Sequence, residues 1–235
     1  MDEFKKGIKK GIPIAFGYIP IGIAFGMLAN TAKLPVYIII MMSFFVYAGA
    51  SQFMAVGLIT QGVSSIEIIM TTFIVNSRHF LMSSSLTQKF FKKIDEKHFK
   101  FLAFGITDET FAIHSMTKKE NLNKGIIYGV NLVAYLSWVL STIVGILMGK
   151  VLPNIIQSSM GISLYAMFIA LLIPNIKNNK EIKLIVLLTI LISIIFNYTP
   201  YLKDLVQSGV KILLIVSISS IIGALFFKEA VDELE

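Results

Sequence analysis

The chain has 235 residues, of which 55% are hydrophobic and only 15% are charged, with a formal net charge of +7 and no cysteine. A soluble domain usually carries about 25% charged residues, and its surface-to-volume ratio does not allow it to bury this much apolar surface. The composition therefore excludes a soluble globular domain, and the missing cysteines exclude disulfides and thiolate metal sites.

The chain begins with a charged stretch, Met1 to Lys10, which leads into the first apolar run. No small-residue cleavage site follows this run, so we interpret it as a retained helix and not as a signal peptide that is removed. The other lysines also cluster between apolar segments, as the positive-inside rule predicts for cytoplasmic loops. This distribution argues against a nucleic-acid surface, and we predict no nucleic acid among the partners.

A membrane-spanning helix needs about 20 mostly apolar residues, and about seven stretches (six to eight, depending on the shorter ones) come close to that length. They cover approximately residues 11–31, 35–61, 64–87, 101–116, 125–149, 154–174, 183–199 and 209–227. The sequence predicts an all-α polytopic membrane protein that forms a single integral membrane domain over residues 1–235.

The basic loops of the first half do not fit a simple series of crossings. Their lysines cluster in three places, Lys5–Lys10, Lys89–Lys100 and Lys118–Lys124. If all three clusters are cytoplasmic, three complete crossings between the first two are not possible. We therefore expect some of segments 35–61, 64–87 and 101–116 to be broken or re-entrant helices. Such helices survive at membrane depth only inside protein or beside a polar cavity, and transporters place their binding sites there. From residue 125 onward, four crossings return the C-terminus to the cytoplasm, where we also place the N-terminus.

Short patterns indicate an internal repeat. Lys10-Gly11-Ile12 opens one apolar segment and Lys124-Gly125-Ile126 opens another. These segments close on the glycine pairs Gly22/Gly26 and Gly145/Gly149, whose spacing lets helix backbones approach closely. We expect the glycines to form packing faces, and the pattern suggests repeat halves of about 10–116 and 124–227.

The first polar group at membrane depth lies within segment 35–61. Gly49, Ala50 and Ser51 form a run of small residues, and Gln52 follows directly. Gly49 can break the helix, and a new helix starting near Ser51 would direct its N-terminal amides toward a carboxylate. We therefore predict that Gly49, Ala50, Ser51 and Gln52 bind substrate. The alternative is a tight helix crossing in which Gln52 bonds to a neighbouring helix.

The second polar group, Asn76, Arg78 and His79, lies deep within segment 64–87, where facing lipid would be costly. Arg78 is the only arginine of the chain, so lysine serves everywhere else for positive charge. The planar guanidinium can hold a substrate carboxylate or pair with an acidic side chain. We predict substrate binding by Asn76 and Arg78 and proton coupling by His79. The alternative is that Arg78 and His79 extend to the membrane interface.

The third polar group is the acidic pair Asp108 and Glu109, inside the short segment 101–116. A carboxylate in a low-dielectric site can take up and release protons near neutral pH, as a proton-coupled carrier requires. Adjacent helix residues project about 100° apart, so we expect one acid to face a cavity and the other to pair elsewhere. His114 would extend a relay. We predict proton coupling by Asp108 and Glu109, with a helix N-cap at Thr107 or Asp108 as the alternative role.

Enzyme motifs are missing from the sequence. There is no HExxH pair, no phosphate-binding loop and no GxSxG elbow. We therefore predict that the chain is not an enzyme, and that it has no catalytic residues, no metal site and no cofactor.

Four blocks follow one another in the first half: GIPIAFGYIPIGIAFG (11–26), FVYAGASQF (45–53), VNSRHFLMSSSL (75–86) and ITDETFAI (106–113). In order and spacing they resemble the AzlC family, the large subunits of two-component branched-chain amino acid exporters. The second half is compatible with that family only in its hydropathy.

The resemblance implies a secondary transporter that exports leucine, isoleucine, valine and similar apolar amino acids across the cytoplasmic (inner) membrane, driven by the proton motive force. It also implies a small AzlD-like membrane subunit as partner. The matching positions are Gly49, Ala50, Ser51, Gln52, Asn76, Arg78, His79, Thr107, Asp108 and Glu109. A carrier for another small zwitterionic or anionic solute and a non-transporting scaffold or sensor subunit are the alternatives.

Overall fold

The computed structural model describes residues 2–90, 94, 98–118, 123–149, 169, 172–173, 176–177, 179–199 and 208–226. Every extended element within these residues is a helix: α1 (Asp2–Thr31), α2 (Val36–Met41), η1 (Met42–Val46), α3 (Gly49–Thr60), α4 (Ser65–Phe90), α5 (Phe99–Phe104), α6 (Asp108–Met116), α7 (Lys124–Met148), α10 (Lys180–Tyr198) and α12 (Ser208–Phe226). The predicted all-α class is confirmed. The described residues fall into two compact units, one within 1–62 and 75–164 and the other within 63–74 and 165–235.

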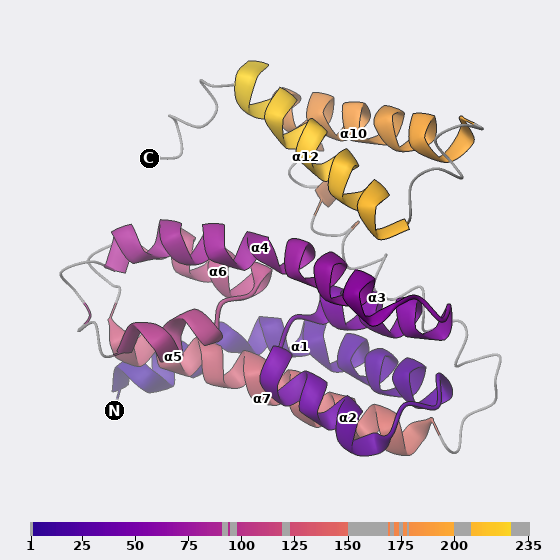
Figure 1. Cartoon of the computed structure of the whole chain (residues 1–235). Helices are drawn as coiled ribbons and strands as arrows, with labels where there is room; N and C mark the ends of the chain where they lie inside the picture. The colour runs from indigo at the N-terminus through magenta and orange to yellow at the C-terminus, as the bar shows by residue number, and fades with distance from the viewer. Residues whose placement is uncertain are drawn as a thin grey trace. The chain divides into compact units, whose positions relative to one another are not determined.

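Helices α1 and α7 run parallel and in close contact through the first unit (Figure 1). The contacts follow the same order along both helices: Gly7 lies against Ile126, Gly11 against Val130, Gly22 against Ser141 and Gly26 against Thr142. A Cβ atom added at Gly26 would lie 2.2 Å from the carbonyl oxygen of Thr142, and one added at Gly145 would lie 2.2 Å from that of Ile23. Glycine is needed for this approach of the two backbones. The predicted packing role of Gly26 and Gly145 is confirmed.

Segment 36–60 breaks in the middle. Helix α2 continues as the π-helix η1, which ends at Tyr47, and α3 begins at Gly49. Tyr47 has left-handed backbone angles (φ 46°, ψ 44°), and the non-helical Ala48 that follows (φ −137°, ψ 82°) completes the change of direction. In Figure 1, α2 and α3 both extend from this break toward the end of the unit where α1 and α7 finish. The two helices therefore form a hairpin.

Segment 99–116 forms a second hairpin of opposite direction. Helix α5 ends at Phe104 and α6 begins at Asp108, and both extend toward the end where α1 and α7 start (Figure 1). At that end, His98 Nδ1 lies 2.9 Å from the hydroxyl of Tyr128, and Lys10 Nζ lies 3.5 Å from the hydroxyl of Thr117. The break itself lies halfway along α1, where Tyr18 contacts it.

Helix α4 is continuous over 26 residues, which corresponds to a length of about 39 Å. Near its C-terminal end, Lys89 donates a 3.1 Å hydrogen bond to the carbonyl oxygen of His114, at the end of α6. The lysines Lys10, Lys89 and Lys118 therefore belong to one end of the unit. This arrangement removes the conflict between the basic loops and the number of crossings. The prediction of broken helices is confirmed for 35–61 and 101–116, whereas segment 64–87 is unbroken.

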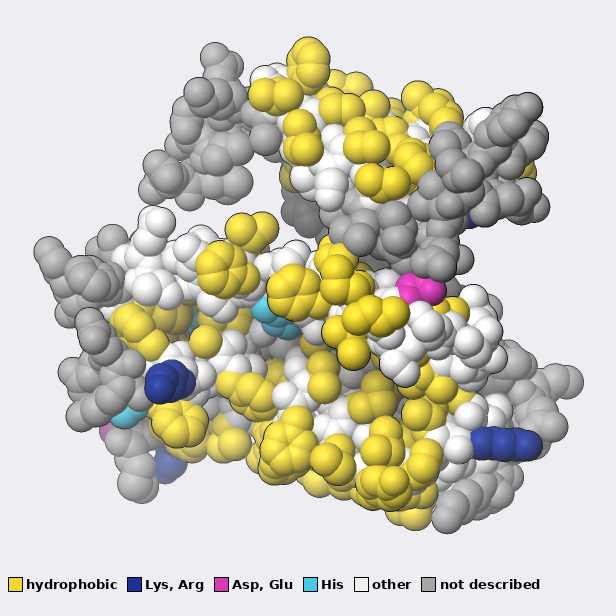
Figure 2. Space-filling view, in the orientation of Figure 1, with side chains coloured by type: hydrophobic (Ala, Val, Ile, Leu, Met, Phe, Trp, Pro, Cys, Tyr) yellow, Lys and Arg dark blue, Asp and Glu magenta, His cyan; other side chains and the backbone are white. Residues whose placement is uncertain are grey.

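Three of the described helices are long and apolar enough to cross a membrane, namely α1, α7 and α10. Apolar side chains also cover much of the molecular surface seen in Figure 2, with few charges among them. Phe16, Phe80 and Phe101 are each more than 70% exposed. A monomeric soluble protein rarely exposes so much apolar surface, whereas the hydrocarbon of a bilayer covers it.

The second unit contains α10 and α12, which correspond to the predicted segments 183–199 and 209–227. They pack against each other, and a Cβ added at Gly223 would lie 3.1 Å from Ile185 Cδ1. Most of the predicted segment 154–174 and the acidic C-terminal tail lie outside the described residues. The number of segments, the single domain over 1–235 and the repeat halves 10–116 and 124–227 remain predictions.

Candidate functional site

The first break is closed by the side chain of Gln52. Its Oε1 accepts hydrogen bonds from the backbone N–H of Ala48 and from Trp138 Nε1, both at 3.1 Å. Its Nε2 donates to Ser43 Oγ at 3.1 Å, and Ser43 in turn lies 2.9 Å from the hydroxyl of Thr142. One buried amide thereby joins η1, α3 and α7. This is the helix crossing that the sequence offered as the alternative for Gln52, and its contact with substrate remains a prediction.

The small residues beside Gln52 allow the break to pack closely on α7. A Cβ added at Gly49 would lie 2.8 Å from Cη2 of Trp138. Ala50 and Ser51 are buried, and the hydroxyl of Ser51 donates a 2.9 Å hydrogen bond to the carbonyl oxygen of Ala48. Helix α3 starts at Gly49, close to the predicted start, and Ala48 supplies no side-chain cap. Binding of a substrate carboxylate by these amides stays a prediction.

The second break presents the start of α6, which Thr107 caps. The hydroxyl of Thr107 accepts from the backbone N–H of Thr110, and that of Thr110 accepts from the N–H of Thr107, so the two form a capping box. The predicted N-cap at Thr107 is confirmed. Asp108 and Glu109 then occupy the first turn of α6, where the helix dipole favours negative charge.

The two acids are bonded to different helices. Asp108 Oδ2 lies 2.7 Å from Nη1 of Arg78 on α4, while Glu109 accepts a short hydrogen bond from the hydroxyl of Tyr18 on α1. The same hydroxyl lies 2.7 Å from Thr107 Oγ1. Because adjacent helix residues diverge by about 100°, the start of α6 is tied to α1 and α4 at once. Both acids therefore have partners, whereas the sequence led us to expect a partner for one of them.

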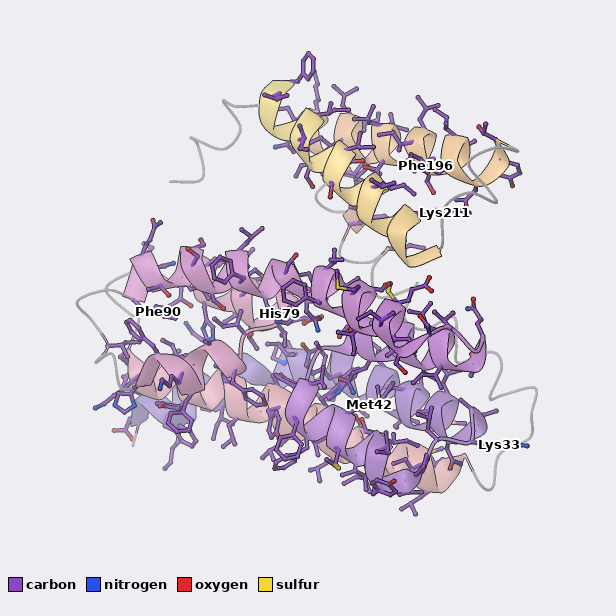
Figure 3. The ribbon with its side chains drawn as sticks, in the orientation of Figure 1. Lys33, Met42, His79, Phe90, Phe196 and Lys211 are labelled. Atoms are coloured by element: carbon purple, nitrogen blue, oxygen red, sulfur yellow. The ribbon has the colours of Figure 1, made fainter. Side chains whose placement is uncertain are left out.

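His79 also faces the second break. Figure 3 labels it on the side of α4 that faces the break, and its Nδ1 lies 2.9 Å from the carbonyl oxygen of Ile106. Three buried atoms of this part of α4 have no hydrogen-bond partner among the described residues: Asn76 Oδ1, Arg78 Nε and His79 Nε2. In a protein interior such atoms are uncommon, because leaving them unpaired costs free energy.

Two tyrosines were missed by the sequence reasoning. Tyr18 and Tyr47 are both buried; the Tyr18 hydroxyl donates to Glu109, whereas that of Tyr47 has no hydrogen-bond partner among the described residues. The ring of Tyr18 packs edge-on against Trp138 at 5.5 Å, and that of Tyr47 lies 6.0 Å from Phe104. The side chains of the two breaks therefore meet at this level. A tyrosine in the middle of an apolar segment is itself a signal, because its hydroxyl needs a polar partner.

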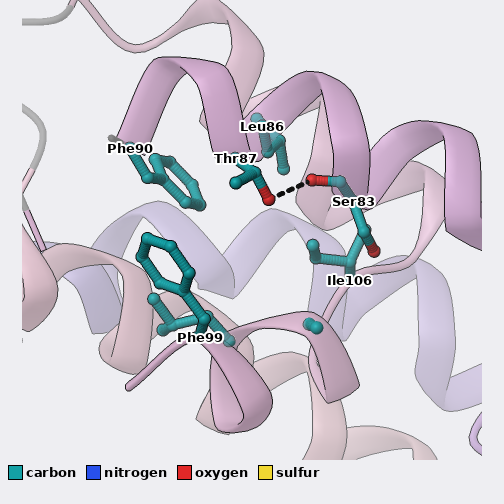
Figure 4. Close-up of a pocket in the computed structure, with 8 residues that line it drawn as sticks. Ser83, Leu86, Thr87, Phe90, Phe99 and Ile106 are labelled. Atoms are coloured by element: carbon teal, nitrogen blue, oxygen red, sulfur yellow. Dashed lines mark hydrogen bonds between the residues drawn. The ribbon is translucent and has the colours of Figure 1, made fainter. Parts of the chain in front are cut away.

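His114 does not continue the acidic pair as a relay in this structure. Its Nε2 lies 2.8 Å from Oδ1 of Asn131 on α7, and its ring packs edge-on against Phe90. Near it, α4 and α5 enclose a small apolar hollow (Figure 4), lined by Ser83, Leu86, Thr87, Phe90, Phe99, Leu102, Ala103 and Ile106. The Thr87 hydroxyl in that hollow donates to the carbonyl oxygen of Ser83 within its own helix.

The structure thus brings Arg78, His79, Asp108 and Glu109 together at the second break, and it places Gly49–Gln52 at the first. At the second break, opposite charges meet beside the unpaired polar atoms of α4, and at the first break α3 begins without a side-chain cap. Such a set offers partners to a small ligand that carries both charges. The described residues contain no group of three or more histidines, aspartates or glutamates arranged for a metal ion.

Comparison with known proteins agrees with these features. Residues 13–152 match the family described as AzlC protein. An uncharacterised membrane protein of Archaeoglobus fulgidus is 36% identical over 176 residues, which cover 74% of this chain and 76% of the relative. The inner membrane protein YgaZ of Escherichia coli K12 is 27% identical over 185 residues, 76% of each chain.

A further relative carries a functional name. The branched-chain amino acid transport protein AzlC of Bacillus subtilis is 28% identical over 149 residues, 63% of this chain and 58% of the relative. No solved structure matches the chain. The matched residues 13–152 include both breaks and the polar residues described at them.

Proposed function

The chain belongs to the AzlC family of membrane transport proteins, and from this premise we propose that it exports branched-chain amino acids. The proposed substrates are leucine, isoleucine, valine and similar apolar amino acids. Export across the cytoplasmic membrane would be driven by the proton motive force. The observation that carries the proposal is the Arg78–Asp108 ion pair at the break between α5 and α6, because it places a cation for the substrate carboxylate beside an acid for the proton.

The ion pair supports a specific order of events. Arg78 Nη1 holds Asp108 at 2.7 Å, and both side chains are about one-third exposed, so a ligand can reach them. The guanidinium has five N–H donors and can bind a substrate carboxylate while it remains paired. Protonation of Asp108 would remove the pairing charge and with it the fixed position of Arg78. Proton and substrate would then exclude each other, which is the condition for exchange.

Glu109 would be the second proton-coupling group. Its carboxylate is held by Tyr18, so a change in its charge alters the link between α6 and α1. Gly49, Ala50, Ser51 and Gln52 would shape the opposite wall of the site, at the first break. An apolar substrate side chain needs only apolar neighbours, such as the Phe104 ring, which lies 6.0 Å from that of Tyr47.

A small AzlD-like subunit is the partner implied by the family, and the lipid bilayer covers the apolar surface. The start of α1, the end of α4 and the start of α7 meet at one end of the first unit, where the lysines cluster. Under the positive-inside rule, this end would be cytoplasmic, together with the N-terminus. The C-terminus would lie on the same side.

The test is counterflow of labelled leucine in proteoliposomes, with and without the small subunit. Accumulation of label against an unlabelled internal pool is expected with both chains present, since only a carrier produces it. Asp108→Asn should abolish leucine transport that is driven by a proton gradient. Asp2→Asn, at the start of α1, is the matched control. Folded protein that accumulates no leucine would favour another zwitterionic or anionic solute, and no flux with any solute would favour a scaffold or sensor subunit.

A further inference from the structure

We propose that Asn76 and His79 of α4 bind the ammonium group of the transported amino acid. This inference rests on the proposed function. It assigns His79 to substrate binding, whereas the sequence predicted a role in proton coupling, and it leaves the acids Asp108 and Glu109 to the proton.

The tautomer of the neutral His79 ring follows from its one hydrogen bond. Nδ1 lies 2.9 Å from the carbonyl oxygen of Ile106, and a carbonyl oxygen can only accept. Nδ1 is therefore the donor, and Nε2 of the neutral ring carries a lone pair. That lone pair is buried, and within the described part of the chain it meets no donor.

Asn76 supplies a second acceptor of the same kind. Its Oδ1 is also buried and meets no donor among the residues that the structure describes. Asn76 and His79 are three positions apart on the continuous helix α4, so their Cβ atoms are neighbours at about 5–6 Å. One turn of the helix therefore offers two adjacent acceptors that both require a donor.

An ammonium group fits this requirement better than the other ligand groups of an amino acid. It brings three N–H donors and no acceptor, and hydrogen bonds to a charged donor are stronger than neutral ones. Burying an acceptor without a partner costs free energy, which arrival of the ammonium would recover. A carboxylate, in contrast, has only acceptor atoms and could not donate a hydrogen bond to Asn76 or His79.

The acids at the start of α6 are less suited to this role because each already has a partner. Asp108 is paired with Arg78 and Glu109 with Tyr18. Arg78 also has a buried Nε that meets no acceptor within the described residues. Within one turn, α4 thus combines a free donor for the carboxylate with two free acceptors for the ammonium. An α-amino acid carries both groups on one carbon atom.

The experiment separates the two charged groups of leucine with two labelled probes. The first, 3-methylbutan-1-amine, keeps the ammonium and lacks the carboxylate; the second, 4-methyl-2-oxopentanoate, keeps the carboxylate and lacks the ammonium. Equilibrium binding is measured on the purified full chain with its small subunit, so that turnover is not needed. Asn76→Leu and His79→Phe should weaken binding of the amine about tenfold or more and leave the 2-oxo acid unchanged.

Three further variants make the result decisive. Arg78→Lys should weaken the 2-oxo acid more than the amine. Asn76→Asp keeps an acceptor oxygen and should retain the amine. Asn197→Leu is the matched control, because the exposed Asn197 amide donates only to Ser193 of its own helix among the described contacts. It should change neither probe.

The outcomes for the inference and for the proposed function are distinct. If the wild-type chain shows leucine counterflow and Asn76→Leu and His79→Phe bind the amine as the wild type does, the ammonium site is wrong and the exporter stands. The same conclusion follows if Asn76→Asp loses the amine tenfold, which also decides the matter should Asn76→Leu fail to assemble. If the wild type neither transports leucine nor binds either probe, the proposed function fails and the ammonium site with it.

Discussion

The parallel contact between α1 and α7 makes a quantitative prediction for Gly26→Ala. The added Cβ would lie 2.2 Å from the backbone oxygen of Thr142, whereas ordinary contacts begin at 3.4 Å, so the helices must separate locally by about 1.2 Å. Gly17, on the same helix, has nothing within 4 Å of its added Cβ. Gly17→Ala is therefore the matched control.

Both substitutions gain the same helix propensity, about 1 kcal/mol, because alanine replaces glycine inside a helix. The difference between the two variants in the free energy of unfolding then isolates the clash. Overpacking costs about 1–3 kcal/mol, and we expect the upper part of this range because the opposing atom is backbone and cannot rotate away. Gly26→Ala should be less stable than Gly17→Ala by roughly 2–3 kcal/mol.

The chain contains its own probe for this measurement. Trp138 on α7 is the single tryptophan, and its ring lies 5.5 Å from that of Tyr18 and 6.1 Å from that of Phe25, both on α1. Its fluorescence during reversible detergent unfolding should report the separation of the two helices. Equal stability of Gly26→Ala and Gly17→Ala, within about 0.5 kcal/mol, would refute the close glycine contact.

Three other predictions follow from the breaks. Gln52→Leu leaves two buried N–H donors without their acceptor, which costs about 1–3 kcal/mol for each donor. The melting temperature of this variant should therefore lie well below that of the control Gln61→Leu, whose side chain is exposed. Equal melting temperatures would mean that Gln52 does not hold the first break. Tyr18→Phe keeps the ring contact with Trp138 but removes the hydroxyl that donates to Glu109, so leucine exchange should slow about tenfold. An unchanged rate would show that the Tyr18–Glu109 hydrogen bond does not govern transport. The chain has no cysteine, so single cysteines can be labelled with a thiol reagent that does not cross the membrane. Gln88→Cys and Lys118→Cys should react from one side of the membrane and Gln61→Cys from the other. Labelling of Gln88→Cys and Lys118→Cys from opposite sides would exclude the two hairpins.

The conflict between the lysine positions and the number of segments correctly predicted breaks in the first half of the chain. The exact position of the first break was predicted wrongly. Gly49 was the expected break point because glycine tolerates unusual backbone angles. The left-handed residue is instead Tyr47, two positions earlier. Its ring packs against Phe104 and Tyr135, and the Gln52 side chain closes the turn. Contacts with residues far along the chain therefore outweigh the local preference, and local patterns do not reveal them.

The candidate site was predictable in its members but not in its pairings. Polar residues at membrane depth stand out by type alone, and Arg78, Asp108 and Glu109 were identified in this way. Which acid meets Arg78 depends on how α6 is rotated against α4, and that rotation is fixed by tertiary packing. For the same reason the sequence did not reveal Tyr18 as the partner of Glu109, although both are within matching blocks.

The glycine contact between α1 and α7 also sets an order for assembly during synthesis. Gly7 meets Ile126, so about 120 residues must be added before the face of α1 is covered. At about 5–20 residues per second, this takes roughly 6 to 24 seconds, during which α1 stays in the bilayer without its partner. Its exposed glycines can pair with any other small-residue helix in that interval. The newly made chain is therefore most vulnerable to misassembly before its own middle has emerged from the ribosome.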